Sequence, residues 1–415
     1  MSISVKKIGE IATVKGGKRL PKGKSVLDGP TAHPYLRVVD FADDGIDRSN
    51  LKYIDEETFE AIKRYTIQAG DVYISIAGTI GRVGIVPEDL SGASLTENAA
   101  KITNFSDEVD HRYLMCFLRG SVGQGQIANL TGGTSQPKLA LYRIAEIGFP
   151  FPPLPTQKRV SEIISAYDTL IENNRRRIQL LEQAARLLYK EWFVRLRFPG
   201  YEHVRVKDGV PEGWERRTAF EVMDVLSGGT PKTSVPSYWG DDIPFFTPKD
   251  ATDCLYTFST ERTLTEDGLR NCSSRLYPKD TLFITARGTV GKLTLAQTDM
   301  AMNQTCYALI AQPPLNQHFL YFALVEGVEQ FRSRAVGSVF DAIIRDTFRQ
   351  IPFLVPDESV IRMFSNHVTP MIRQIDALSH ETRKLAQARE LLLPRLMSGD
   401  GAGSLIVVDP REIFP

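Results

Sequence analysis

Two glycine-rich segments that contain lysine could bind phosphate. They are Gly16-Gly17-Lys18 and Gly291-Lys292. A phosphate-binding loop needs another glycine six residues before the lysine and a Ser or Thr directly after it. Ala12 and Ala286 stand at the glycine position, and neither lysine is followed by a hydroxyl residue. The sequence therefore supports no nucleotide site.

Other catalytic arrangements are also missing. The sequence contains neither a G-x-S-x-G nucleophile turn nor an H-E-x-x-H zinc motif, and its six histidines are scattered. Eight acidic residues fall between Asp40 and Glu60, and we interpret them as a solvated face rather than a metal site. Cys116, Cys254, Cys272 and Cys306 form no C-x-x-C pair, so we expect buried free thiols in a reducing cytoplasm. We expect no catalytic centre, no metal and no cofactor.

Side chains that donate hydrogen bonds recur in four loops of each half of the chain. Such donors suit base edges and phosphates of DNA, although surface solubility explains any single one equally well. The candidates are Lys15, Lys18, Arg19, Arg37, Arg82, Thr134, Ser135, Gln136 and Lys138 in the first half and Thr230, Lys232, Thr247, Lys249, Arg287, Lys292, Ser338 and Arg345 in the second.

Overall charge gives no sign of a nucleic-acid partner, because 50 basic residues balance 50 acidic ones. The charges are sorted locally, however. Residues 1–24 hold seven Lys and Arg against Glu10 alone, whereas the stretch from Asp40 to Glu60 is acidic. We interpret the run Arg175-Arg176-Arg177 as a solvated helix face or as a contact to a partner protein. A neutral chain with a basic strip is compatible with weak DNA binding that partner subunits reinforce.

The elements that must position these side chains occur twice. A length of 415 residues suggests two to four domains, and two halves match at a nearly constant separation. The segment 78–82 (GTIGR) corresponds to 288–292 (GTVGK), 210 residues later. We also match 14–17 with 226–229. Apolar runs at 35–39, 71–78, 281–286 and 351–356 predict strands, and 111–120 and 317–334 predict helices.

Each half ends in a long amphipathic helix. Apolar positions from Thr156, and again from Val360, alternate in steps of four and three, which is the spacing of a coiled-coil seam. We predict two antiparallel helices of about 38 residues in which residue r faces 556 − r. This register pairs Asn174 with Thr382 and Tyr167 with Arg389, and the Asn174/Thr382 layer fixes it.

Two prolines complicate the second helix. Pro370 falls inside the apolar pattern, and proline costs about 3 kcal/mol in a helix interior. We therefore expect a kink or a late start near Thr369. Pro394 is expected to mark the frayed end of this helix.

The sequence therefore predicts an α+β protein with two pseudo-symmetric modules and an antiparallel two-helix coiled coil. The expected segments are a first module (1–153), a central helix (154–197), a connector (198–214), a second module (215–355), a C-terminal helix (356–398) and a tail (399–415). Two similar modules related by a pseudo-twofold suit a target that is itself roughly twofold, such as duplex DNA.

Several strings resemble the specificity (S) subunit of type I restriction-modification systems. Each string alone is weak, but their order within a duplicated chain is fairly specific. They are 152–160 (PPLPTQKRV), 189–193 (YKEWF), 211–215 (PEGWE), 227–232 (SGGTPK), 243–250 (IPFFTPKD) and 285–292 (TARGTVGK).

The resemblance implies two target-recognition domains that each read one half of a bipartite, asymmetric site on double-stranded DNA, with helices that set the unread spacer. It also implies two modification subunits, which bind S-adenosylmethionine and methylate adenine, and ATP-dependent restriction subunits. Catalysis would belong to these partners, and the chain would act in the cytoplasm without a membrane partner. A self-sufficient DNA-modifying enzyme and a coiled-coil scaffold that binds only protein remain the alternatives.

Overall fold

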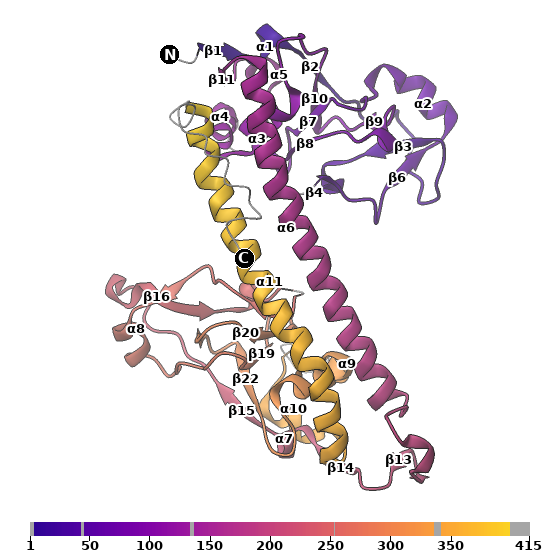
Figure 1. Cartoon of the computed structure of the whole chain (residues 1–415), viewed down its shortest axis with the longest axis vertical. Coiled ribbons are helices and arrows are strands. Elements are labelled where there is room, and N and C mark those ends of the chain that lie inside the picture. The colour runs from indigo at the N-terminus through magenta and orange to yellow at the C-terminus, as the bar shows by residue number, and fades with distance from the viewer. Residues whose placement is uncertain (1–3, 43–44, 133–136, 253, 336–341, 399–415) are drawn as a thin grey trace. The chain divides into compact units, whose positions relative to one another are not determined.

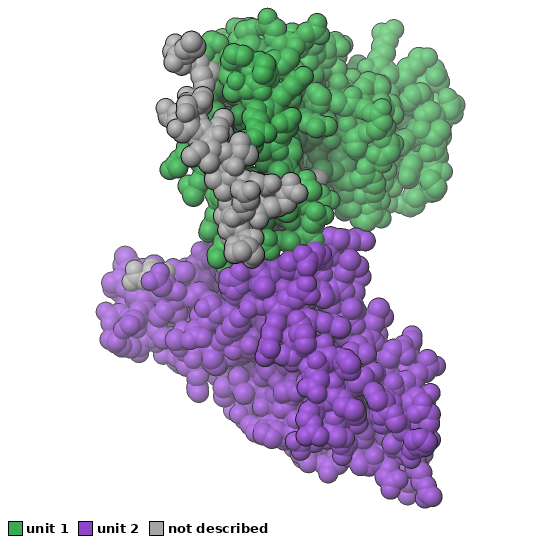
Figure 2. All heavy atoms as spheres, in the orientation of Figure 1, with its two compact units in different colours: residues 1–174, 381–415 green, residues 175–380 purple. Residues whose placement is uncertain are grey.

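The computed structural model describes all residues except 1–3, 43–44, 133–136, 253, 336–341 and 399–415 (Figure 1). The chain divides into two compact units, coloured separately in Figure 2. Unit 1 comprises Met1–Asn174 with Glu381–Pro415, and unit 2 comprises Arg175–His380. Each unit therefore contains one globular module and one part of each long helix, whereas the domain boundaries predicted from the sequence follow single segments of the chain.

The core of the first module is a four-stranded antiparallel sheet. Its order is β2 (Thr13–Gly16), β10 (Ala99–Thr103), β7 (Val72–Ser75) and β8 (Val83–Ile85). Alternate residues of a strand face opposite sides of a sheet. Val72 and Ile74 accordingly pack in one core with side chains of α3 (His111–Arg119), whereas Tyr73 packs in another core with Phe41.

Smaller elements complete the first module. They are the sheet β6 (Lys52–Ile54), β3 (His33–Leu36) and β9 (Ser94–Leu95); the pairs β1 (Ser4–Lys7) with β11 (Gly148–Phe151) and β4 (Phe41–Ala42) with β5 (Gly45–Ile46); and the helices α1 (Ile8–Ile11), α2 (Glu56–Ile62), α4 (Ser121–Leu130) and α5 (Leu141–Ala145).

The second module repeats the strand order of the main sheet, of the three-stranded sheet and of the β1–β11 pair, and it adds a fifth strand to the main sheet. Its main sheet runs β15 (Met223–Ser227), β22 (Cys306–Ala311), β19 (Leu282–Thr285), β20 (Leu293–Ala296) and β17 (Tyr256–Thr257). The other elements are β18 (Thr263–Leu264), β16 (Trp239–Phe246) and β21 (Ala301–Met302); β14 (Glu215–Thr218) with β23 (Pro352–Val355); β12 (Val206–Lys207) with β13 (Val210–Pro211); and α7 (Ala219–Val222), α8 (Glu266–Arg270), α9 (Gln317–Ala335) and α10 (Arg345–Gln350). The predicted α+β fold with a duplicated module is confirmed.

Strand pairing corrects one detail of the predicted repeat. Gly16 lies opposite Ala100 on β10, and Ser227 lies opposite Tyr307 on β22. Since Ala100 and Tyr307 in turn pair with Ile74 and Ile284, which match in the repeat, Gly17 corresponds to Gly228 rather than to Gly229. A Cβ on Gly17 would lie 2.0 Å from the Thr96 carbonyl oxygen, and one on Gly228 would lie 2.2 Å from the Met302 carbonyl oxygen. Both positions therefore require glycine.

Two long helices contribute to both units. The helix α6 covers Leu154–Tyr189 and continues as one π-helical turn to Val194, and α11 covers Glu358–Ser398. In unit 1, Arg389 donates to the carboxylate of Asp168 at 2.6 Å. In unit 2, the ring of Trp192 lies 6.0 Å from that of Phe364. The early part of α6 thus meets the late part of α11 in unit 1, and the late part meets the early part of α11 in unit 2, as the predicted antiparallel pair requires.

The predicted polar layer contains a buried amide. Asn174 is 5% exposed, and its Nδ2 has no hydrogen-bond partner among the described residues. Thr382 is half-buried. Contact between these two side chains stays a prediction, as does contact between Tyr167 and Arg389.

Neither proline interrupts α11 where the sequence suggested. The helix begins at Glu358, well before Pro370, and continues past Pro394 to Ser398. Pro370 and Asn366, whose carbonyl loses its intrahelical donor, are both exposed, so water can satisfy that carbonyl. Phe364 and Ile372, buried on either side, anchor the helix in the core. Tertiary packing therefore outweighs the local cost of the proline.

The cysteines divide into two groups. Cys116 and Cys306 are buried, and burial raises the pKa of each thiol to about 12. Cys254 is exposed, which corrects the expectation of burial for that residue, and Cys272 is half-buried. None of the helices in the described part of the chain combines the length and apolar character that crossing a bilayer requires.

Candidate nucleic-acid interface

An open hollow in the second module brings together donors from three separate loops. Thr247 follows β16, Arg287 follows β19, and Asn303 lies between β21 and β22. β16 runs parallel to β21 in one sheet, and β19 runs antiparallel to β22 in another. The loop that joins β21 to β22 therefore starts beside the end of β16 and finishes beside the end of β19, which brings the three loops together. The residues that line this recognition hollow are Thr247, Pro248, Lys249, Glu261, Arg262, Arg287, Gly288, Asn303 and Thr305.

One carboxylate holds two loops of the recognition hollow in place. Asp250 accepts hydrogen bonds from the backbone N–H of Thr247 at 2.8 Å and from its hydroxyl at 2.7 Å. A second oxygen of Asp250 accepts the backbone N–H of Glu261 at 2.7 Å. Asp250 thus ties the loop at Thr247 to the loop at Glu261.

Positive charge is exposed at the rim. Lys249 is 79% exposed at its side chain and lies 3.5 Å from the carboxylate of Glu261. Arg287 is exposed, and among the described residues it forms neither an ion pair nor a side-chain hydrogen bond. An arginine that the protein leaves uncommitted can bind an anion or a base edge without breaking an internal bond.

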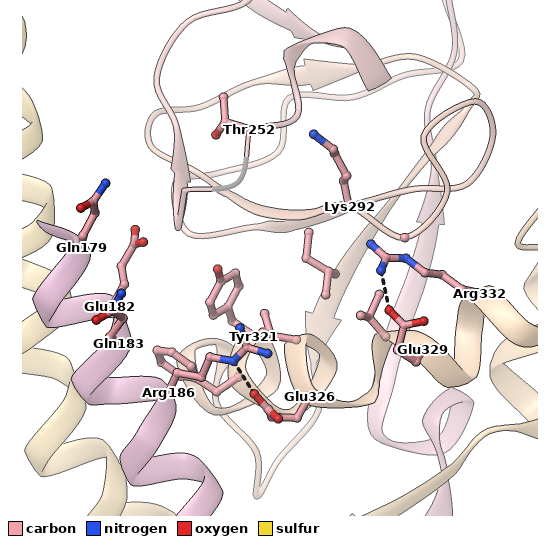
Figure 3. Close-up of a pocket in the computed structure, with 15 residues that line it drawn as sticks. Gln179, Glu182, Gln183, Arg186, Thr252, Lys292, Tyr321, Glu326, Glu329 and Arg332 are labelled. Carbon is pink, nitrogen blue, oxygen red and sulfur yellow. Dashed lines mark hydrogen bonds and ion pairs between the residues drawn. The ribbon is translucent and has the colours of Figure 1, made fainter. Parts of the chain in front are cut away.

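Lys292 lies in a different place from Arg287, although the sequence grouped them in one loop. Lys292 lines a cleft between β20, α6 and α9, where Gln179 and Glu182 project from α6 (Figure 3). Burial raises the pKa of the Glu182 carboxyl, which also accepts the backbone N–H of Leu255 at 2.8 Å.

Other charges that line this cleft are already paired. Arg186 binds Glu326, and Arg332 binds Glu329 (Figure 3). Two of its cations are therefore neutralised, so the cleft is a weaker candidate for phosphate binding than the recognition hollow.

The remaining predicted residues of the second module that the structure describes do not line the recognition hollow. The hydroxyl of Thr230 hydrogen-bonds to Gln304, and Lys232 is exposed. Arg345 is the first residue of α10, and its guanidinium lies 5.5 Å from the ring centroid of Phe220. Ser338 lies outside the described residues.

Several predicted residues of the first module are exposed. Lys15 is exposed on β2, and Lys138 is exposed and forms an isolated antiparallel bridge with Ala77. The amino group of Lys18 lies 5.5 Å from the ring centroid of Tyr65, and Arg19 pairs with Glu97 at 2.7 Å. Thr134, Ser135 and Gln136 lie outside the described residues.

Two predicted arginines of the first module serve the fold. Arg37 donates two hydrogen bonds to Asp40, at 3.1 and 2.7 Å, and another to the carbonyl of Asn50 at 2.8 Å. Asp40 is 3% exposed, which corrects its assignment to a solvated acidic face. Arg82 donates to the carbonyl of Phe41. DNA could reach these arginines only in competition with internal bonds.

Equivalent turns of the two modules carry different side chains. In the first, the N–H of Arg37 donates to Asp40 at 2.7 Å, and in the second the N–H of Thr247 donates to Asp250 at 2.8 Å. Each acid closes a 3₁₀ turn of the same length, 38–40 and 248–250. The scaffold is shared, but an internally paired arginine stands where the second module has a threonine.

Sequence reasoning missed Arg262 and its neighbour Trp239. The guanidinium carbon of Arg262 lies 3.3 Å from the ring centroid of Trp239. The available signal was the repeat, because Arg262 corresponds to Lys52, another cation. This pairing follows from strand register, since Tyr53 faces Pro34 and Thr263 faces Pro244.

Comparison with known families gives a match over most of the chain. Residues 2–183 and 211–361 match the model described as "Type I restriction modification DNA specificity domain". The two matched stretches each include one globular module. The duplication seen in the strand order is therefore also a duplication of this family's domain.

Individual relatives agree. The chain is 23% identical to the type I restriction enzyme HindI specificity subunit of Haemophilus influenzae, over 85% of this chain and 90% of that protein. It is 30% identical to the type I restriction enzyme MjaIX specificity subunit of Methanocaldococcus jannaschii, over 36% of each. The crystal structure of a type I restriction-modification S subunit from M. genitalium has the same fold, with a TM-score of 0.60, 15% identity and 95% and 96% coverage.

Proposed function

The chain belongs to the family of type I restriction-modification DNA specificity domains, and we propose that it reads the DNA sequence for a type I restriction-modification complex. The observation that carries this proposal is the recognition hollow, where Thr247, Lys249 and Arg287 converge on one open edge of the second module. Hydroxyl, ammonium and guanidinium donors are the groups that bind phosphates and base edges.

Each module is proposed to read one half of a bipartite, asymmetric site. Shared strand order supplies two similar platforms, whereas the tips differ, as with Arg37 and Thr247. Different side chains on a common frame select different bases. In the first module Lys15, Lys18 and Lys138 are the exposed candidates for DNA contact.

Catalysis is proposed to belong to partner subunits in the cytoplasm. Two modification subunits would bring S-adenosylmethionine to the adenine of each half-site, and ATP-dependent restriction subunits would join for cleavage. The relatives are themselves named as specificity subunits of restriction enzymes, which supports this division of labour. Binding of labelled S-adenosylmethionine by the purified chain alone would contradict it.

The test is sequence selection from a pool of randomised duplexes at stated salt, with the chain purified together with its modification subunits. Arg287→Ala should lower the base preference in one half-site about tenfold, equivalent to roughly 1.4 kcal/mol, and leave the other half-site unchanged. Arg270→Ala is the matched control, because Arg270 pairs with Glu266 on α8 and does not line the recognition hollow. Equal loss in both half-sites would contradict the proposed division.

A further inference from the structure

Trp239 forms a rigid platform at the start of β16. Its ring meets the buried ring of Phe245 edge-on, at 5.5 Å and 82°. Its indole N–H donates to the carbonyl of Lys232 at 3.4 Å. The pairing of β16 with β18 shifts register between Trp239 and Ile243, both of which face Leu264. This bulge re-aims the tryptophan, since a bulge bends and twists a strand locally.

Arg262 is held on this platform. With 3.3 Å between its guanidinium carbon and the indole centroid, the planar group is in close cation–π contact with the ring. Among the described residues the guanidinium has no ion pair and no hydrogen bond, so its N–H donors are uncommitted. The tryptophan thus restricts the rotamers of a side chain that, like Arg287, lines the recognition hollow.

We propose that Arg262, oriented by Trp239, is a specificity-determining residue that reads guanine in the half-site of the second module. This inference rests on the proposed function. Guanine presents two acceptors, O6 and N7, on its major-groove edge, and an arginine fork bonds both at once. Loss of side-chain freedom is a cost of such contacts, and the tryptophan removes much of it before DNA arrives.

Lys52, the residue of the first module that corresponds to Arg262, has a different partner. Lys52 forms an ion pair with Asp28, and this contact lowers the pKa of the Asp28 carboxyl. The ammonium is therefore neutralised by a neighbouring carboxylate, whereas Arg262 stacks on an aromatic ring. At this equivalent position the first module has a lysine that is paired with an acid, and the second module has an arginine that is oriented by a tryptophan.

A phosphate contact would give a different result. Phosphate binding carries no sequence information, so loss of Arg262 would then weaken binding to all duplexes by the same factor. Arg262→Lys keeps the positive charge but removes the bidentate fork. This substitution therefore separates guanine reading from phosphate binding.

The experiment is again selection from randomised duplexes with the chain and its modification subunits. The wild-type complex should select a guanine at one position of one half-site. Arg262→Lys should lower that single preference about tenfold or more, with every other position unchanged. Trp239→Leu, which keeps apolar contact with Phe245, should lower the same preference by a smaller factor. Unchanged preference in the other half-site shows that both variants are folded and assembled.

Arg270→Lys is the matched control and should select the wild-type sequence. An unchanged motif with Arg262→Lys, or equal weakening on all duplexes, would overturn the assignment of Arg262 while leaving the proposed function intact. If the wild-type complex selects no sequence, the proposed function fails, and the assignment fails with it.

Discussion

At the scale of single residues, the partner of each arginine decides what that arginine can do. Arg37 is 25% exposed and bonds to a buried carboxylate, whereas Arg262 lies on an indole ring and Arg287 is exposed. Breaking a buried ion pair leaves an uncompensated charge in a poorly solvated place. Arg37 is therefore better explained by stability of the first module than by DNA contact.

Asp40→Asn should lower the free energy of unfolding of unit 1 by about 2 kcal/mol. This is below the usual cost for fully buried pairs, because solvent still reaches the Arg37 guanidinium. The measurement is urea unfolding. Asp89→Asn removes an exposed ion pair with Arg48 and should cost less than about 1 kcal/mol. Equal effects of the two substitutions would show that the Arg37–Asp40 pair is no more than a surface contact.

At the scale of elements, α11 shows how packing overrides local preference. A proline removes one helical hydrogen bond and crowds the preceding turn. Nevertheless α11 is continuous because Phe364, Val368 and Ile372 are buried around Pro370. The folded protein still carries the energetic cost of Pro370, so replacing this proline should change the free energy of unfolding measurably.

Pro370→Ala should raise the free energy of unfolding by about 1–3 kcal/mol, because an N–H donor returns to the carbonyl of Asn366. Pro370→Gly restores the same donor but has a helix propensity about 1 kcal/mol poorer than alanine, so its gain should be smaller. Both are measured by urea unfolding. A loss of stability with alanine would mean that α11 requires the proline.

At the scale of the whole molecule, each unit contains one cysteine buried in its core. Cys116 lies in the core of unit 1 and Cys306 in that of unit 2. Burial holds both thiols protonated, because the pKa of each is raised to about 12. The thiolate is the reactive form, so these residues should be inert in the folded protein.

Iodoacetamide at neutral pH should therefore label Cys254 first and leave Cys116 and Cys306 unmodified until the protein unfolds. Mass spectrometry along a urea series would then report the unfolding of each unit separately. Because the folded pKa exceeds the ordinary thiol value, the stability contributed by these protons is present below about pH 9 and is lost as the pH rises toward 12. Rapid labelling of Cys116 in native buffer would contradict its burial.

Much of the architecture could be predicted from the sequence. The repeat, the strands at Val72–Ser75 and Leu282–Thr285, and the long helices follow from hydrophobic periodicity and from turns that need glycine. Gly78, with a φ of 75°, and Gly81, with a φ of 89°, close the turn between β7 and β8. Such signals depend on residues close together in the chain, so they can be recognised in the sequence alone.

Tertiary packing sets which hydrogen-bond donors are exposed and which are already paired. Arg37 and Arg287 are equivalent as residue types, yet one is bound to Asp40 and the other is exposed. The repeat matches Arg262 with Lys52, but its contact with Trp239, 23 residues earlier and beside a strand bulge, is visible only in the folded chain. Contacts between side chains distant in sequence arise from strand pairing, which composition and spacing do not specify. The family and the duplicated frame thus follow from local sequence patterns, whereas the exposure and the partners of each side chain on that frame depend on tertiary packing.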